Sequence, residues 1–246
     1  METSALQTDF LTKTVAQMVT EDFRTAEVFK KFGIDFCCGG KQKIEDVCRK
    51  KGIDPADLEK ALREKLEKSD ASAQNFNEWK LDFLADYIVN VHHKYVADNI
   101  PLLRELTAKV ARVHGEAHSE VVEIARLFEA VASELEQHMM KEENILFPYI
   151  KELARAESSG PITSPPFGTV GNPIRMMEME HENAGNILKK IGELSNGFTP
   201  PPDACNTYRV SYLKLREFEM DLHQHIHLEN NILFPKAIEL ESRLLG

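Results

Sequence analysis

Apolar residues recur at helical spacing along most of the chain, and stretches rich in proline, glycine and serine separate the segments. The apolar period is close to 3.6 residues rather than two, which argues against β-strands. Pro101 is expected to kink or break the first long helix. The pattern predicts an all-α protein, an antiparallel four-helix bundle preceded by a small helical domain. The long helices are expected at about 77–112, 116–154, 174–195 and 206–244.

The boundaries of these parts follow from composition. We place the small helical domain at residues 8–67, because three short helical segments there end at glycines or begin near a proline. Residues 68–76 are small and polar, and we interpret them as a linker. The bundle then occupies residues 77–246, with a long loop rich in proline, glycine and serine at 158–173.

Two segments of the predicted bundle nearly coincide. Both read H-x-x-x-E-[EN]-N-I-L-F-P, and they begin 87 residues apart, at His138 and at His225. A further histidine precedes each copy at almost the same spacing, His93 by 45 residues and His181 by 44. Each half is therefore expected to be a helical hairpin that carries one histidine on its first helix and the motif on its second. Two such hairpins make a four-helix bundle with pseudo-twofold symmetry.

The spacing within each motif has a chemical reason. Residues four apart lie on one helical face, so His138 with Glu142, and His225 with Glu229, can present a nitrogen and an oxygen to one point. The apolar run after each glutamate directs that face to the core, where an ionised carboxylate needs a compensating cation. A solvated ion pair would explain one copy but not two matched ones. We expect metal ligands at His93, His138, Glu142, His181, His225 and Glu229, a set that suits iron, manganese or zinc rather than copper(I).

At these residues the chain resembles the repair-of-iron-centres family of the ScdA/YtfE type, a branch of the haemerythrin-like proteins. The matching stretches are DFCCGG at 35–40, HMMKEENILFP at 138–148, MEMEHENAG at 177–185 and HIHLENNILFP at 225–235. The resemblance implies two iron ions in a non-haem di-iron centre on the six residues above. It also implies a cytoplasmic stress protein that restores iron–sulfur clusters damaged by nitric oxide or peroxide, with damaged or apo iron–sulfur proteins as partners.

Two other functions stay open beside iron supply for cluster repair. One is an enzyme that reductively couples nitric oxide at the di-iron centre, and the other is a non-catalytic sensor or carrier of oxygen or nitric oxide. Nitric oxide or oxygen species are the small ligands in each case. The formal charge of −10 disfavours nucleic acid, and no apolar run is long enough for a membrane helix. The sequence leaves a homodimer open.

Further side chains are candidates for supporting roles. Cys37 and Cys38 precede a short predicted helix whose amino end would favour thiolate, so they form a candidate redox or relay pair; a buried turn is the alternative. Glu134 and Glu180 lie near the histidines and are candidate acceptors for imidazole N–H groups. His92 is expected to be a neighbour of the site rather than a ligand. His223 and His227 are expected to face solvent, and Cys205 receives no role.

Overall fold

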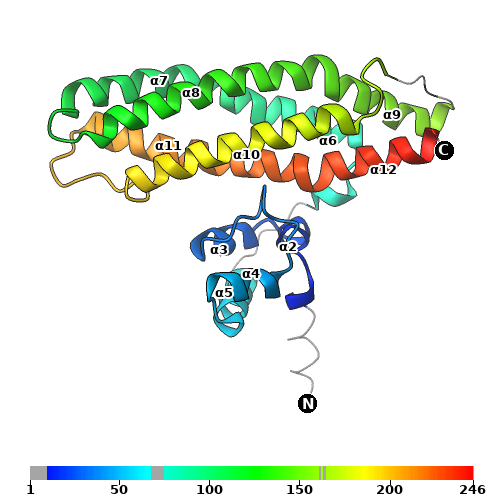
Figure 1. The fold of residues 1–246 in the computed structure, drawn as a ribbon, viewed down its shortest axis with the longest axis horizontal. Coiled ribbons are helices and arrows are strands. Elements are labelled where there is room, and N and C mark those ends of the chain that lie inside the picture. Colours follow the sequence, from blue (N-terminus) through cyan, green and yellow to red (C-terminus); the bar gives the residue numbers. More distant parts are fainter. Residues whose placement is uncertain (1–9, 68–74, 161, 163–164, 246) are drawn as a thin grey trace. The chain divides into compact units, whose positions relative to one another are not determined.

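The computed structural model describes residues 10–67, 75–160, 162 and 165–245 (Figure 1). Within these residues the regular elements are helices, together with one isolated antiparallel bridge between Thr14 and Lys43. The chain divides into two compact units: Met1–Lys80 with Ile226–Lys236, and Leu81–His225 with Ala237–Gly246. No helix in the described part of the chain combines the length and the apolar character needed to cross a membrane.

Between residues 13 and 80, the described part of the first unit forms four short α-helices and one 3₁₀ turn. These are α2 (Val15–Glu21), α3 (Thr25–Lys31), α4 (Ile44–Lys51), α5 (Pro55–Glu67) and the 3₁₀ turn η1 (Phe76–Glu78). Thr14 and Gln17 form a reciprocal capping box at the start of α2, which satisfies two backbone N–H groups that a helix start leaves without partners. Helix α4 ends at Lys51 and is capped by Gly52, whose left-handed conformation (φ +66°) favours glycine. The core of this unit includes Val15, Val19, Phe29, Ile44, Leu58 and Leu62.

The second unit contains the long helices, and three of its rods change from α to π geometry along their length. The first rod is α6 (Leu81–Tyr87), the π segment η2 (Ile88–His93) and α7 (Lys94–His114). The second is α8 (Glu120–Lys141), the π segment η3 (Glu142–Leu146) and α9 (Phe147–Ser159). The third is α10 (Gly171–Leu194). The last is α11 (Asn206–Leu228), the π segment η4 (Glu229–Leu233) and α12 (Phe234–Leu245), so the division between the units falls inside one continuous rod.

Large apolar side chains hold these rods together. Helix α8 packs against both α7 and α10 (Figure 1). Phe218 of α11 meets Phe128 of α8 edge to face, with ring centroids 5.5 Å apart, and lies 6.4 Å from Tyr95 of α7. Aromatic pairs of this kind add roughly 0.5–1.5 kcal/mol to the gain from burial alone. Leu84, Ile88, Ile100, Leu103, Val131, Ile150 and Ile191 complete the core.

The prediction of an all-α bundle behind a small helical domain is confirmed. Pro101, however, lies inside α7, which continues without a break from Lys94 to His114. The predicted loop at 158–173 is shorter, because α9 extends to Ser159 and α10 begins at Gly171. Of the predicted linker, residues 68–74 lie outside the described residues, and its last residue, Phe76, is buried and begins η1.

Candidate metal centre

The two copies of the repeated motif share an unusual backbone. Glu142 is the first residue of η3 and Glu229 the first residue of η4. In each copy the N–H of the phenylalanine donates to the glutamate carbonyl five residues earlier, from Phe147 to Glu142 and from Phe234 to Glu229. The proline that follows has no N–H for the α-helical bond, which fits a widened turn. Such π segments are rare and occur frequently at functional sites.

The remaining helical segments bring the predicted ligands together. His93 ends the π segment η2, His138 lies in the last turn of α8, and His181 is in the middle of α10. His225 and Glu229 are four residues apart on the last rod. All six residues are at most 2% exposed. Two carboxylates and four imidazoles therefore share the interior of the bundle, away from water.

These six side chains form two groups that could each hold a metal ion. One group is His93, Glu142, His225 and Glu229, and the other is His138, Glu142, His181 and Glu229. Within each group the nitrogen and oxygen atoms offered as ligands lie within 4.8 Å of one another. Glu142 and Glu229 belong to both groups, which is the arrangement expected of carboxylates that connect two metal positions.

Individual distances agree with this grouping. The Oε2 atom of Glu142 lies 3.3 Å from Nε2 of His93 and 3.3 Å from Nε2 of His138, so one carboxylate faces an imidazole of each group. The Nε2 atoms of His138 and His181 are 3.0 Å apart. Burying two glutamates costs several kcal/mol unless a cation compensates them. The donor set is mixed nitrogen and oxygen, so the residues present fit iron, manganese or zinc.

Carboxylates on the outer side of two imidazoles fix their orientation. The Nδ1 atom of His138 lies 2.8 Å from Oε2 of Glu180, and Nδ1 of His93 lies 2.8 Å from Oε1 of Glu143. An imidazole that donates its Nδ1–H in this way presents Nε2 to a metal as an acceptor. Partial burial raises the pKa of Glu180, but the bonds from Lys141 and His138 outweigh it and lower the pKa overall. Glu180 thus stays an anionic acceptor.

The two glutamates proposed from the sequence as acceptors have different surroundings. Glu180 contacts His138 as described, whereas Glu134 is exposed and accepts a bond from Nδ2 of Asn183 at 2.5 Å. Glu134 is one turn before His138, but its carboxylate points to the surface. Glu143 was not predicted as an acceptor, although its position next to Glu142 is a signal that could have identified it. His92 belongs to neither metal group; its Nδ1 lies 3.0 Å from Oδ1 of Asp221 and its ring stacks on His225.

A third group that could hold a metal lies in the first unit. The carboxylate of Asp35 accepts backbone N–H groups of Cys37, Cys38 and Gly39 at 3.0, 3.1 and 2.9 Å, which fixes the turn DFCCGG. The two sulfurs are 3.9 Å apart, and Asp35, Cys37 and Cys38 together could hold a metal. The expected thiolate is wrong for Cys37. The hydrogen bond with Cys38 and burial raise its pKa well above the usual value, and α4 begins only at Ile44.

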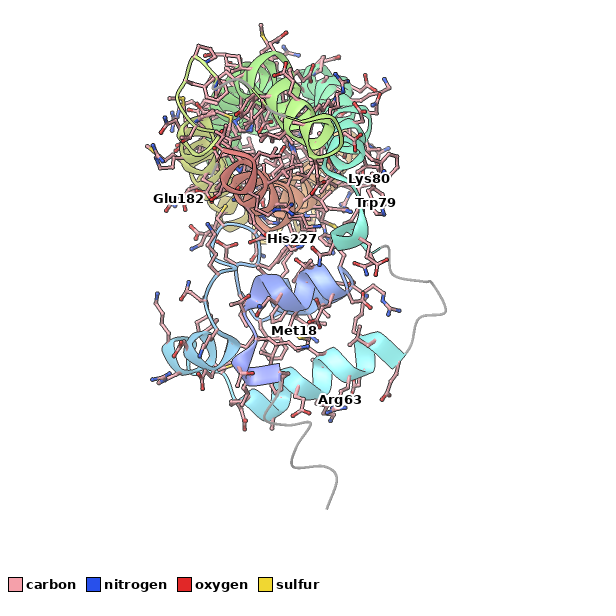
Figure 2. All side chains as sticks on the ribbon, turned by 90° about the vertical axis from the view of Figure 1, so that its right-hand side faces the viewer. Met18, Arg63, Trp79, Lys80, Glu182 and His227 are labelled. Atoms are coloured by element: carbon pink, nitrogen blue, oxygen red, sulfur yellow. The ribbon has the colours of Figure 1, made fainter. Side chains whose placement is uncertain are left out.

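His227 also departs from its predicted exposure. This residue, labelled in Figure 2, is 1% exposed and packs in the first unit against Phe23 and Phe36, with ring centroids 5.9 and 6.1 Å away. Asn231 donates to Nδ1 of His227 at 3.1 Å and to the carbonyl of Cys37 at 3.1 Å. Burial lowers the pKa of His227 to about 4, so this imidazole is neutral at pH 7. His227 was expected to face solvent because it lies two residues from His225, on another side of the helix. That spacing alone could not show that other residues of the first unit cover this side.

A four-helix bundle that buries two His–Glu groups around shared carboxylates defines a metal-binding bundle. Residues 84–237 match the family model described as Hemerythrin HHE cation binding domain, and residues 11–66 match ScdA_N, described as Domain of Unknown function (DUF542). The chain belongs to the hemerythrin HHE family, in the branch of ScdA/YtfE-type proteins that carry both domains.

Several relatives match this chain over nearly their whole length. A protein of Musicola paradisiaca named iron-sulfur cluster repair protein YtfE is 37% identical over 230 residues, which is 94% of this chain and 98% of that protein. The protein of the same name from Pectobacterium atrosepticum is 38% identical over 218 residues, 89% and 93% of the two chains. A probable iron-sulfur cluster repair protein of Haemophilus influenzae is 38% identical over 215 residues, 86% and 90%.

Proposed function

We propose that this chain holds two iron ions and supplies iron for the repair of iron–sulfur clusters damaged by nitrosative or oxidative stress. The observation that carries the proposal is the sharing of Glu142 and Glu229 between two four-residue groups. His93 and His225 would complete one iron position, and His138 and His181 the other. The relatives named as iron–sulfur cluster repair proteins support the choice of iron and of function.

The protein's own residues prepare the centre in two ways. Glu143 and Glu180 hold the Nδ1 protons of His93 and His138, so Nε2 of each ring faces the interior as a neutral donor. Apolar side chains exclude water, and the ring of Phe147 stacks on His93 with centroids 5.6 Å apart. Bound iron supplies redox chemistry and Lewis acidity at this position. Iron released to an acceptor is the cargo of the proposed reaction.

Purified protein should hold about two irons per chain, because two matched half-sites exist. The measurement is metal analysis of protein purified without oxygen, together with its absorption spectrum. One tightly held zinc per chain without iron would contradict the di-iron proposal.

Iron donation can be tested directly. Protein loaded with isotopically labelled iron is incubated without oxygen with an apo iron–sulfur protein, sulfide and a thiol reductant, and labelled iron is measured in the reisolated acceptor. We expect cluster absorption to return with labelled iron in it. The matched control is the Glu142→Leu, Glu229→Leu variant supplied with the same total iron. Equal recovery with this variant would show that free iron alone explains the repair.

One observation favours a second function. Carboxylates shared by two groups would hold two metal ions side by side, as reductive coupling of two nitric oxide molecules requires. The balance is two nitric oxide, two electrons and two protons giving nitrous oxide and water. An added reductant supplies the electrons in the test, and Cys37 and Cys38 are the candidate relay in this chain. Nitrous oxide formed catalytically by the loaded protein, without cluster recovery, would favour this enzyme over iron donation.

We further propose that residues 8–67 and 77–246 act as separate functional parts, with 68–76 as a linker. The family-model boundaries at 11–66 and 84–237 support this division. The four cysteines are free thiols, which fits a reducing cytoplasm.

A further inference from the structure

Cys205 occupies the amino end of α11, in the second unit. Its carbonyl accepts the first helical bond, from the N–H of Arg209 at 3.0 Å, so it is the N-cap of the helix. The backbone N–H groups of Tyr208 and Thr207 act on its sulfur and lower the pKa of the thiol. A cap sulfur in this position is stabilised as thiolate by those N–H groups and by the helix dipole.

A histidine lies directly against this sulfur. The Nε2 atom of His114, the last residue of α7, is 3.2 Å from Sγ of Cys205. His114 and Cys205 are 91 residues apart in sequence, so the chain folds two separate turns together to make the pair. A thiol within hydrogen-bonding reach of an imidazole is the arrangement that activates cysteine nucleophiles. Cys205 itself is exposed, so a small molecule can reach the sulfur.

The neighbouring histidine, His118, has carboxylate partners of its own. Its Nε2 lies 3.0 Å from Oδ2 of Asp203, and its Nδ1 lies 3.3 Å from Oε1 of Glu120. Its bond to Asp203 raises the pKa of His118 and lowers that of Asp203, so His118 compensates this carboxylate. The ring of Tyr208 lies 5.1 Å from that of His114. Cys205 belongs to none of the metal-holding groups in the described residues, so a reactive thiol fits better than a metal ligand.

We propose that the Cys205–His114 pair is a reactive thiol site that forms mixed disulfides with small-molecule disulfides such as oxidised glutathione. The Cys205 thiolate attacks one sulfur, the sulfur–sulfur bond of the small molecule breaks, and one of its thiolates leaves. The reaction needs no other oxidant, and an excess of the reduced thiol reverses it. The backbone N–H groups of the helix end and His114 lower the pKa of Cys205, which raises its thiolate fraction near neutral pH.

The other cysteines provide an internal comparison. Cys37 and Cys48 are buried, and their pKa values are raised, by the neighbouring thiol and burial for Cys37 and by burial for Cys48. Cys38 is partly exposed. Modification at Cys205 should leave the metal centre untouched, because 20 residues of helix separate it from His225, roughly 30 Å at 1.5 Å per residue.

The test is the rate of mixed-disulfide formation with oxidised glutathione, followed by peptide mass mapping of the full-length protein between pH 5.5 and 9. We expect Cys205 to react several times faster than Cys38 at pH 7, because its lowered pKa raises the thiolate fraction by more than it reduces the nucleophilicity of that thiolate, and because its side chain is exposed. His114→Gln should shift the rate profile of Cys205 to higher pH. His118→Gln is the matched control, since it removes a neighbouring imidazole that does not touch the sulfur.

Two results would overturn the proposal. One is a Cys205 rate no greater than that of Cys38 in the unchanged protein. The other is an unaltered pH profile in the His114→Gln variant, with circular dichroism showing that the variant is folded. Cys205→Ser keeps an N-cap oxygen and should abolish the fast-reacting site while leaving iron content unchanged, so loss of iron in that variant would also contradict the inference.

Discussion

The two copies of the repeated motif have the same sequence pattern but different surroundings. In the first copy, the residue after the glutamate, Glu143, is exposed and contacts His93. In the second copy the equivalent residue, Asn230, is buried. Three residues after each glutamate, Ile145 is 51% exposed and Ile232 only 1%. His227 of the second copy is enclosed by Phe23 and Phe36.

The comparison separates what the motif itself determines from what its neighbours determine. Both copies form a π turn that begins at the glutamate and both place that glutamate in the interior. The face of the helix that points away from the metal groups differs. It is exposed to solvent in the first copy, whereas other residues of the first unit cover it in the second. In the first copy Glu143 contacts His93 of the preceding rod, whereas the second copy belongs to a packed core.

The largest expected effect tests what the copies share. Glu142→Leu and Glu229→Leu should each remove most of the iron while helix content stays near that of the unchanged protein, because leucine suits a core position. Metal analysis and circular dichroism measure the two properties. Glu105→Leu, on the exposed face of α7, is the control. If both core variants keep full iron, the two carboxylates do not connect the metals.

The next effect tests what the copies do not share. Ile232→Ala should lower the free energy of unfolding by about 2–5 kcal/mol, because the side chain is buried. Ile145→Ala should change it by about 0.5 kcal/mol or less, because that side chain is half exposed. Urea unfolding of metal-free protein measures both. Similar losses for the two variants would mean that the outer faces are not different in solution.

A smaller effect is expected when one copy is made to resemble the other. Glu143→Asn removes the carboxylate acceptor of His93 and places an asparagine where the second copy has Asn230. We expect metal affinity to fall about 10–100-fold, as is typical when the partner of a ligand histidine is removed. Competition with a chelator measures the affinity. Glu134→Gln, at an exposed carboxylate that bonds to Asn183, should leave it unchanged.

The smallest effect concerns the turn of the first unit. Cys37→Ala together with Cys38→Ala should leave iron content unchanged, because neither cysteine belongs to the two His–Glu groups. The same variant should lose activity if the thiols relay electrons, nitrosyl or iron. Iron content and cluster repair are to be measured side by side. Lost iron would make the cysteines ligands or structural supports, and full activity would remove them from the mechanism.

The sequence predicted the helices and the meeting of six side chains because periodicity and repetition are local signals. The ligand roles of those six remain predictions. The outer contacts could not be predicted in the same way, since they depend on tertiary neighbours: Glu143 faces His93 from 50 residues away, and His227 is buried by residues about 200 positions earlier. The raised pKa of Cys37 likewise depends on its burial and on the actual turn geometry.

The π turns after Glu142 and Glu229 change the phase of each rod. A π turn adds a residue without advancing the helix by a full α-helical step, so the apolar stripe beyond it is displaced by about 100° relative to an uninterrupted α-helix. Side chains before and after the turn can then face the same core, although a single heptad repeat would direct only one of the two sets there. Transplanting H-x-x-x-E alone into a straight designed helix would carry the ligands but misdirect the packing beyond them. A design that reuses this motif should therefore transfer the whole stretch from His138 to Pro148, including the proline.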